Sequence, residues 1–269
     1  LLQAVTDPNS QVRLVLTLRA DFYDRPLMYP KFGRLVEEHT AVVLPLTPEE
    51  LQLAIRQPAE RVGAVLEKGL VEEITADVED QPGSLPLLQY ALTELFERRE
   101  GRMLTLQAYQ SIGGVLGALG RRAEGVYQDL EAGDKNLARQ LFLRLVTLGE
   151  GAEDTRRRVP QAELEALTSP ARVKFVLEAF GSARLLSFDR DPVTRGPTVE
   201  VAHEALLREW ARLRGWLDES RADIRMQRLL GTATRDWLAG GQELSFLLRG
   251  SRLAQFEEWA GETSLVLTP

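Results

Sequence analysis

The chain has 269 residues, of which 44% are hydrophobic and 27% charged, and its formal net charge is −7. These values are typical of a globular protein that is long enough for two or three packed units. The sequence contains no cysteine, which excludes disulfides and thiol catalysis, and no apolar run long enough to cross a membrane. We therefore expect a cytoplasmic protein with no membrane partner. The acidic balance also argues against non-specific nucleic-acid binding by the whole chain.

The first predicted elements are two short apolar runs, Val12–Arg19 and Thr40–Leu46. Both are rich in leucine and β-branched residues, which is the pattern of strands buried on both faces of a parallel sheet. Residues 20–38 leave room for a crossover helix, so the sequence predicts one β-α-β unit. Because the chain starts without Met and two strands cannot form a domain, we expect residues 1–46 to be the trailing edge of an α/β sheet that begins upstream.

The sequence of residues 47–133 predicts a helical bundle without strands. Thr47, Pro48 and Glu50 provide an N-cap, a proline in the first turn and a capping box. Pro58 is expected to kink or split the helix that follows. The glycine-rich residues 113–117 lack a preceding strand and a following Lys-Ser, so we interpret them as a helix breaker. The other helices of this bundle are predicted over 70–78, 85–98, 106–112 and 115–130.

Residues 134–219 predict a winged helix domain, and residues 220–269 predict a helical tail that Gly240 and Gly241 interrupt. The fold class is therefore mainly α, with small β elements at the N-terminal edge and in the wing. The elements expected here are helices over 137–148, 161–167, 171–180, 204–219, 224–238 and 251–260, an extended segment at 158–160, and a hairpin of 185–188 with 198–201.

Three side chains lie where a ligand could reach them. Arg19 ends the first predicted strand, where ligands of open α/β sheets bind and where a guanidinium can contact phosphate, although an ion pair with a nearby aspartate is the alternative. Pro86 lies in the first turn of a predicted helix, either as part of its cap or as a flat ring against a nucleobase. His203 follows the second wing strand, either as a cap or as an anion contact.

Two motifs that phosphate chemistry requires are missing from the sequence. It has no Gly-x-x-x-x-Gly-Lys-Ser/Thr, whose backbone amides cradle the phosphates of a nucleotide. It also has no predicted strand that ends in an acidic pair able to hold Mg²⁺. We therefore expect no hydrolysis by this chain alone and assign no catalytic or metal-binding residue.

Taken together, these landmarks resemble the STAND NTPases, specifically the bacterial novel STAND type that is often fused to WD-repeat propellers. Residues 15–22 are similar to the sensor 1 strand, which implies that Arg19 senses the γ-phosphate. Residues 82–92 are similar to the Gly-x-Pro motif of the lid, which implies that Pro86 packs on adenine. Residues 202–204 stand where relatives carry Met-His-Asp, which implies that His203 contacts the β-phosphate of ADP. Alanine and glutamate replace the outer two residues of that motif.

The resemblance implies an AAA+-related ATP-binding signalling protein in which ADP and ATP control oligomerisation. It places the phosphate-binding half upstream in the same protein, with Mg²⁺ bound only by the intact protein, and a repeat sensor domain downstream. The homo-oligomer that the family implies is a further expected partner.

Two other functions remain open from the sequence. The first is a DNA-binding regulator, whose winged helix would present cations to a phosphate backbone, although acidic residues lie in the same segment. The second is a structural interaction module without a nucleotide role. The residues concerned in the DNA-binding hypothesis are the cations Arg156, Arg157, Arg158, Arg172 and Lys174 and the acidic Glu163, Glu165 and Glu178.

Overall fold

The computed structural model describes residues 5, 7, 9–18, 23–79, 84–149 and 153–268. The chain separates into two compact units, Leu1–Leu46 and Thr47–Pro269. It is mainly helical, as the sequence predicts, and its strands are short. In the described part of the chain, no helix is long and apolar enough to serve as a membrane span.

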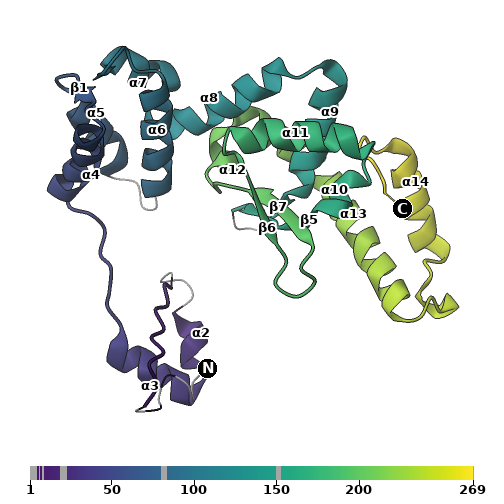
Figure 1. The fold of residues 1–269 in the computed structure, drawn as a ribbon. Helices are drawn as coiled ribbons and strands as arrows, with labels where there is room; N and C mark the ends of the chain where they lie inside the picture. The colour runs from purple at the N-terminus through teal and green to yellow at the C-terminus, as the bar shows by residue number, and fades with distance from the viewer. Residues whose placement is uncertain are drawn as a thin grey trace. The chain divides into compact units, whose positions relative to one another are not determined.

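The N-terminal unit contains two contacting helices, α2 (Asp24–Leu27) and α3 (Pro30–His39), in the region predicted for the crossover (Figure 1). The two predicted strands are not formed: residues 11–18 and 40–46 have no strand pairing. A strand requires a hydrogen-bonded neighbour, and in the described part of this unit neither run is paired with another strand. The side chains of Val15 and Val43 are accordingly 87% and 93% exposed.

The second unit begins with α4 (Pro48–Arg61), which carries the predicted capping box. The Thr47 hydroxyl accepts a hydrogen bond from the Glu50 amide at 3.2 Å, and the Glu50 carboxylate accepts one from the Thr47 amide at 2.8 Å. The helix continues through Pro58, so a split at that residue is wrong. Buried side chains on both sides of the proline hold the helix against the core, and these are Leu51, Ile55 and Ala59.

The remaining helices of the bundle lie close to their predicted positions. Gly113 has φ of 88°, which suits glycine, and it separates α7 from α8 as predicted. The bundle also contains a two-residue parallel strand pair, so the prediction of no strands before residue 133 is wrong; such short runs carry no periodicity. The elements are β1 (Val65–Leu66), α5 (Leu70–Glu79), α6 (Leu85–Glu97), β2 (Met103–Leu104), α7 (Leu106–Ile112) and α8 (Gly114–Asp129).

Three helices and a three-stranded antiparallel sheet follow the bundle. The predicted hairpin is confirmed, with Leu186 opposite Val201 and Arg190 opposite Pro197, and the sheet order is β5-β7-β6. The first helix ends four residues before its predicted end, and an additional strand pair, β3 with β4, follows it. The elements are α9 (Ala132–Arg144), β3 (Val146–Thr147), β4 (Thr155–Arg156), β5 (Val159–Pro160), α10 (Gln161–Glu165), α11 (Pro170–Ser182), β6 (Leu186–Arg190) and β7 (Pro197–Val201).

The C-terminal helices differ from the prediction at Trp210. This residue has extended backbone and ends α12 (Leu206–Glu209), so the helix predicted over 204–219 is broken. The next helix, α13 (Ala211–Ala239), runs without interruption across residue 219, where the sequence predicted the start of the tail. Gly240 ends it, and η2 (Leu244–Phe246) and α14 (Gly250–Glu262) follow.

One continuous hydrophobic core joins the bundle to the sheet-containing part of the second unit. Helix α8 contacts α5, α6 and α7 as well as α9, α11 and α12, and Figure 1 shows it between the two groups of helices. Gly120 of α8 lies against the carbonyl of Glu209, so any side chain at this position would collide with the α12–α13 corner. The close approach of these backbones therefore requires glycine.

Candidate functional site

The three predicted site residues have different outcomes. Arg19 lies outside the described residues. Both other residues lie in the second unit: Pro86 is on α6, and His203 is two residues after the end of β7. The candidate site therefore consists of these two residues and of the side chains that contact them in the folded chain.

Pro86 lies near the start of α6, where its missing N–H costs no helical hydrogen bond. Its ring is exposed, whereas the next two residues of the helix are buried. Ser84 holds the N-cap position but makes no side-chain cap; its buried hydroxyl donates to the carbonyl of Val78 at 3.5 Å. The exposed ring leaves Pro86 accessible to a flat ligand.

Tyr90 follows Pro86 by one helical turn, so both residues lie on the same side of α6. The Tyr90 ring meets the His203 ring edge to face, with centroids 5.6 Å apart and an interplanar angle of 71°. The Tyr90 hydroxyl donates to the carbonyl of Ala183, just after α11, at 3.1 Å. Tyr90 thus links the Pro86 helix both to His203 and to the end of α11.

Burial and then the negative charge of Glu94 raise the pKa of Tyr90 well above its usual value. The phenol therefore remains protonated and keeps its hydrogen bond to Ala183. Tyr90 was missed by the sequence analysis. Its position one turn after Pro86 was the available signal, but its partner lies 113 residues away in sequence, which helical spacing cannot indicate.

His203 is half-buried, and its carbonyl accepts a hydrogen bond from the Leu206 amide at 2.9 Å. Burial is the larger cause that lowers the pKa of its imidazole, and the positive charge of Arg156 is the second. The ring is therefore neutral at pH 7 in the ligand-free chain. An anion placed beside it would favour the protonated form.

The neighbouring cation is Arg156 of β4. One of its guanidinium nitrogens donates to the carbonyl of Ala202 at 3.4 Å, and its nearest carboxylate oxygen, on Glu200, is 4.0 Å away. Arg158 holds the same carboxylate more closely, at 3.1 Å. The sequence analysis considered Arg156 only as a possible DNA contact, because β3 and β4 were not predicted and its position beside His203 was therefore hidden.

The other cations of the DNA-binding hypothesis are ion-paired within the chain. Arg157 binds Glu163 through two hydrogen bonds, at 2.9 and 3.0 Å. The two cations of α11 are also paired: Arg172 with Asp134 at 2.6 Å, and Lys174 with Glu178 at 3.6 Å. The surface predicted to face DNA is therefore largely neutralised by its own carboxylates.

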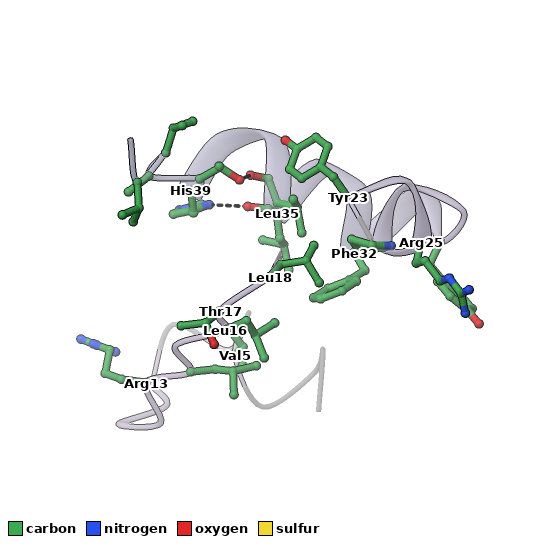
Figure 2. Close-up of a pocket in the computed structure, with 18 of the residues that line it drawn as sticks. Val5, Arg13, Leu16, Thr17, Leu18, Tyr23, Arg25, Phe32, Leu35 and His39 are labelled. Atoms are coloured by element: carbon green, nitrogen blue, oxygen red, sulfur yellow. Dashed lines mark hydrogen bonds between the residues drawn. The ribbon is translucent and has the colours of Figure 1, made fainter. Parts of the chain in front are cut away.

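The N-terminal unit contains a hollow of about 1760 Å³, shown in Figure 2. Its lining is mainly apolar and comes from α3 and from the two runs that do not form strands. His39 at the end of α3 makes a hydrogen bond to the carbonyl of Leu35 at 3.0 Å. The hollow is larger than an ordinary ligand pocket of about 300–1,000 Å³. We attribute it to open packing of the two runs.

The residues that the structure describes include no group of acidic, histidine or cysteine side chains able to hold a metal ion. The fold is that of a mainly helical protein in which a helical bundle and a helix-and-sheet region share one core. The family model of novel STAND NTPase 1 matches residues 1–245, and the chain belongs to this family, as the sequence predicted. No curated protein and no solved structure matches the chain.

Proposed function

We propose that this chain is the nucleotide-sensing regulatory part of a STAND-type signalling NTPase. In this proposal, residues 47–133 form the lid, residues 134–219 a winged helix domain, and residues 220–269 a tail, while residues 1–46 belong to the α/β core. Membership of an NTPase family supports nucleotide binding in general. The assignment of ADP and ATP, and of cytoplasmic signalling, is part of the proposal.

The winged helix assignment is supported by the order of elements after the bundle. A short strand, β5, lies between the first and second of three helices, and it pairs with the last strand of the hairpin. The loop between β6 and β7 would be the wing. Asp191 orders this loop by accepting hydrogen bonds from the amides of Val193 and Thr194, at 2.9 and 2.7 Å.

The observation that carries the sensing proposal is the contact between Tyr90 and His203. It connects the helix that bears Pro86 to the histidine after the wing, although the two are remote in sequence. A nucleotide whose base packs on Pro86 and whose phosphate reaches His203 would bind both parts at once. Replacement of ADP by ATP would then change the relative stability of closed and open arrangements, which is how a ligand drives a switch.

The proposal requires partners that supply what the sequence lacks. The phosphate cradle and the Mg²⁺ ligands would come from an upstream half of the same protein, and Arg19 would sense the γ-phosphate there. A downstream repeat sensor would receive the trigger, and release of the lid would permit homo-oligomerisation. The chain itself would hold ADP mainly through the base and one phosphate.

Calorimetric titration of the chain with ADP tests whether the phosphate cradle must be supplied by the upstream half. We expect a dissociation constant of about 1–10 mM, because the backbone amides of the phosphate cradle are missing. Binding at micromolar or lower concentration would contradict the proposal. The same titration with Pro86→Ala and His203→Ala should weaken any measurable binding further, whereas a purely structural module would show no difference among the three proteins.

A DNA-binding regulator is less well supported, because Arg157 before α10 and the two cations of α11 are paired with carboxylates of the same chain. A gel-shift titration at low salt distinguishes the two functions. The sensing proposal predicts no retained DNA, and a salt-dependent shift would favour the winged helix as a DNA reader.

A further inference from the structure

Arg156 is less completely neutralised than the two arginines that follow it. Arg157 and Arg158 each bind a carboxylate within 3.1 Å, whereas the nearest carboxylate oxygen to Arg156 is 4.0 Å away and is shared with Arg158. Its remaining contact is the 3.4 Å hydrogen bond to the carbonyl of Ala202. The Arg156 side chain is also 43% exposed, so a ligand can reach its guanidinium at the cost of only the long contact to Glu200.

The same guanidinium lies close enough to His203 for its charge to act on the ring. Two groups that can both carry positive charge are therefore neighbours. The Tyr90 ring packs edge to face against the imidazole, and its protonated hydroxyl already donates to the carbonyl of Ala183. The carboxylate nearest to Arg156, on Glu200, is 4.0 Å away and is held more closely by Arg158. This arrangement disfavours protonation of His203 while the site is empty, and an anion between the two groups would reverse the effect.

We propose that Arg156 and His203 together bind the phosphate groups of a nucleoside diphosphate. The inference rests on the proposed nucleotide-sensing function and adds a second phosphate-binding residue to it. The guanidinium offers two parallel N–H donors to phosphate oxygens, and the imidazole offers one donor that becomes charged when the anion arrives. Binding therefore takes up a proton, and affinity for the anion increases as the pH falls from 8 towards 6.

The two histidines of the chain make this inference directly measurable, because His203 can be followed by its imidazole NMR signals while His39 serves as an internal reference. The probe is inorganic pyrophosphate, added to the whole chain at pH 6 and pH 8. We expect the His203 signals to shift on addition, more strongly at pH 6, with the His39 signals unchanged. The pKa of His203 should rise when pyrophosphate is bound.

Arg156→Gln removes the charge without a large change in size. In the absence of ligand it should raise the pKa of His203, because the repelling charge is lost, and it should weaken pyrophosphate binding about tenfold or more. Arg225→Gln, which removes the same charge from the exposed face of α13, is the matched control and should change neither value. Arg156→Lys should restore part of the affinity, since it returns the charge without the two-pronged geometry.

Failure of this inference can be distinguished from failure of the proposed function. A His203 response to pyrophosphate that is equal in wild type and Arg156→Gln would overturn the role of Arg156 and leave the sensing proposal standing. A ligand-free pKa of His203 that is unchanged by Arg156→Gln would overturn the inference as well. If pyrophosphate does not change the His203 signals of the folded wild-type chain at all, both this inference and the sensing proposal are overturned.

Discussion

The two units contain similar apolar sequences, but these side chains are exposed in the first unit and buried in the second. In residues 11–46 the runs of valine and leucine remain largely exposed, with Val15 and Val43 more than four-fifths accessible. In residues 47–269 comparable side chains, such as those of Leu70 and Leu119, are fully buried in one continuous core. Apolar composition alone therefore does not produce a strand or a core, because each requires partner segments that can pack alongside.

The two units should differ most in how much a truncated apolar side chain lowers the free energy of unfolding, and Trp210 should show the largest loss. Its ring packs against Phe142, Phe180 and Trp216, with centroids 5.0–5.9 Å apart, and it is 1% exposed. Trp210→Ala should lower the free energy of unfolding by about 3–5 kcal/mol, measured by urea denaturation. The matched control is Val43→Ala in the first unit, which should change it by less than about 0.5 kcal/mol. Similar losses for both variants would contradict the contrast.

A smaller, pH-dependent effect is expected from Glu124 beside Trp210. Hydrogen bonds from Arg212, at 2.6–3.2 Å, and from the Trp210 indole, at 3.0 Å, lower the pKa of Glu124 from 4.5 to about 2. A lowered folded-state pKa stabilises above the unfolded value, and this stabilisation is lost as the pH falls from about 4.5 to about 2. Because the pair is one-third exposed, Glu124→Gln should cost about 1–2 kcal/mol at pH 7. The difference from wild type should vanish near pH 2 in chemical denaturation, and a pH-independent difference would show that the ion pair is not its cause.

Tyr90 tests whether α6 is anchored by its hydroxyl, its ring, or both. Tyr90→Phe removes the hydrogen bond to Ala183 but keeps the ring against His203, and it should lower the free energy of unfolding by about 1–2 kcal/mol. The pKa of His203, followed by NMR, should barely move. Tyr90→Ala removes the ring as well, which exposes the imidazole to water and should raise the pKa of His203 towards 6.5, since burial is the main cause that lowers it. An unchanged value would show that Tyr90 does not cover the histidine.

The smallest effect concerns the C-terminal segment held against α9. Gln140 donates to the carbonyl of Ser264 and accepts from the amide of Val266, both at 2.9 Å, and Leu265 between them is buried. Gln140→Ala should speed hydrogen exchange at the Val266 amide about tenfold, because its acceptor is lost. Gln161→Ala, which removes an amide that bonds only within α10, is the control and should leave this exchange unchanged. Equal exchange in both variants would mean that the Gln140 side chain does not hold the segment, which would then rest on Leu265 and on the hydrogen bond from Arg144 to the Val266 carbonyl.

Local sequence signals predicted the helices of the second unit and failed at contacts between distant residues. Helix α7 has its predicted bounds because Thr105 caps its start and Gly113 ends it, and α4 begins at its capping box. The break at Trp210 was not predicted, since the extended backbone there is stabilised by the aromatic cluster around the ring. The two N-terminal runs were predicted as strands from composition, which cannot tell whether a neighbouring strand is present.

In the candidate site, too, local sequence signals identified single residues but not the contacts between distant ones. Pro86 and His203 were identified from the residues around them, and the resemblance to the STAND NTPases is confirmed over residues 1–245. Their connection through Tyr90, and the position of Arg156 beside the imidazole, depend on packing between segments far apart in the chain. The nucleotide-sensing roles of the three predicted residues stay predictions, and that of Arg19 falls on a position outside the described residues.

The most direct test of the central claim is the imidazole NMR spectrum of the chain during titration with ADP. If α6 and His203 form a nucleotide-sensing pair, millimolar ADP should shift the signals of His203 and leave those of His39 in place. Pro86→Ala should reduce the response to ADP but not to pyrophosphate, since only ADP carries the base. The account would be contradicted if the signals of His203 in the folded chain stay unchanged up to the solubility limit of ADP.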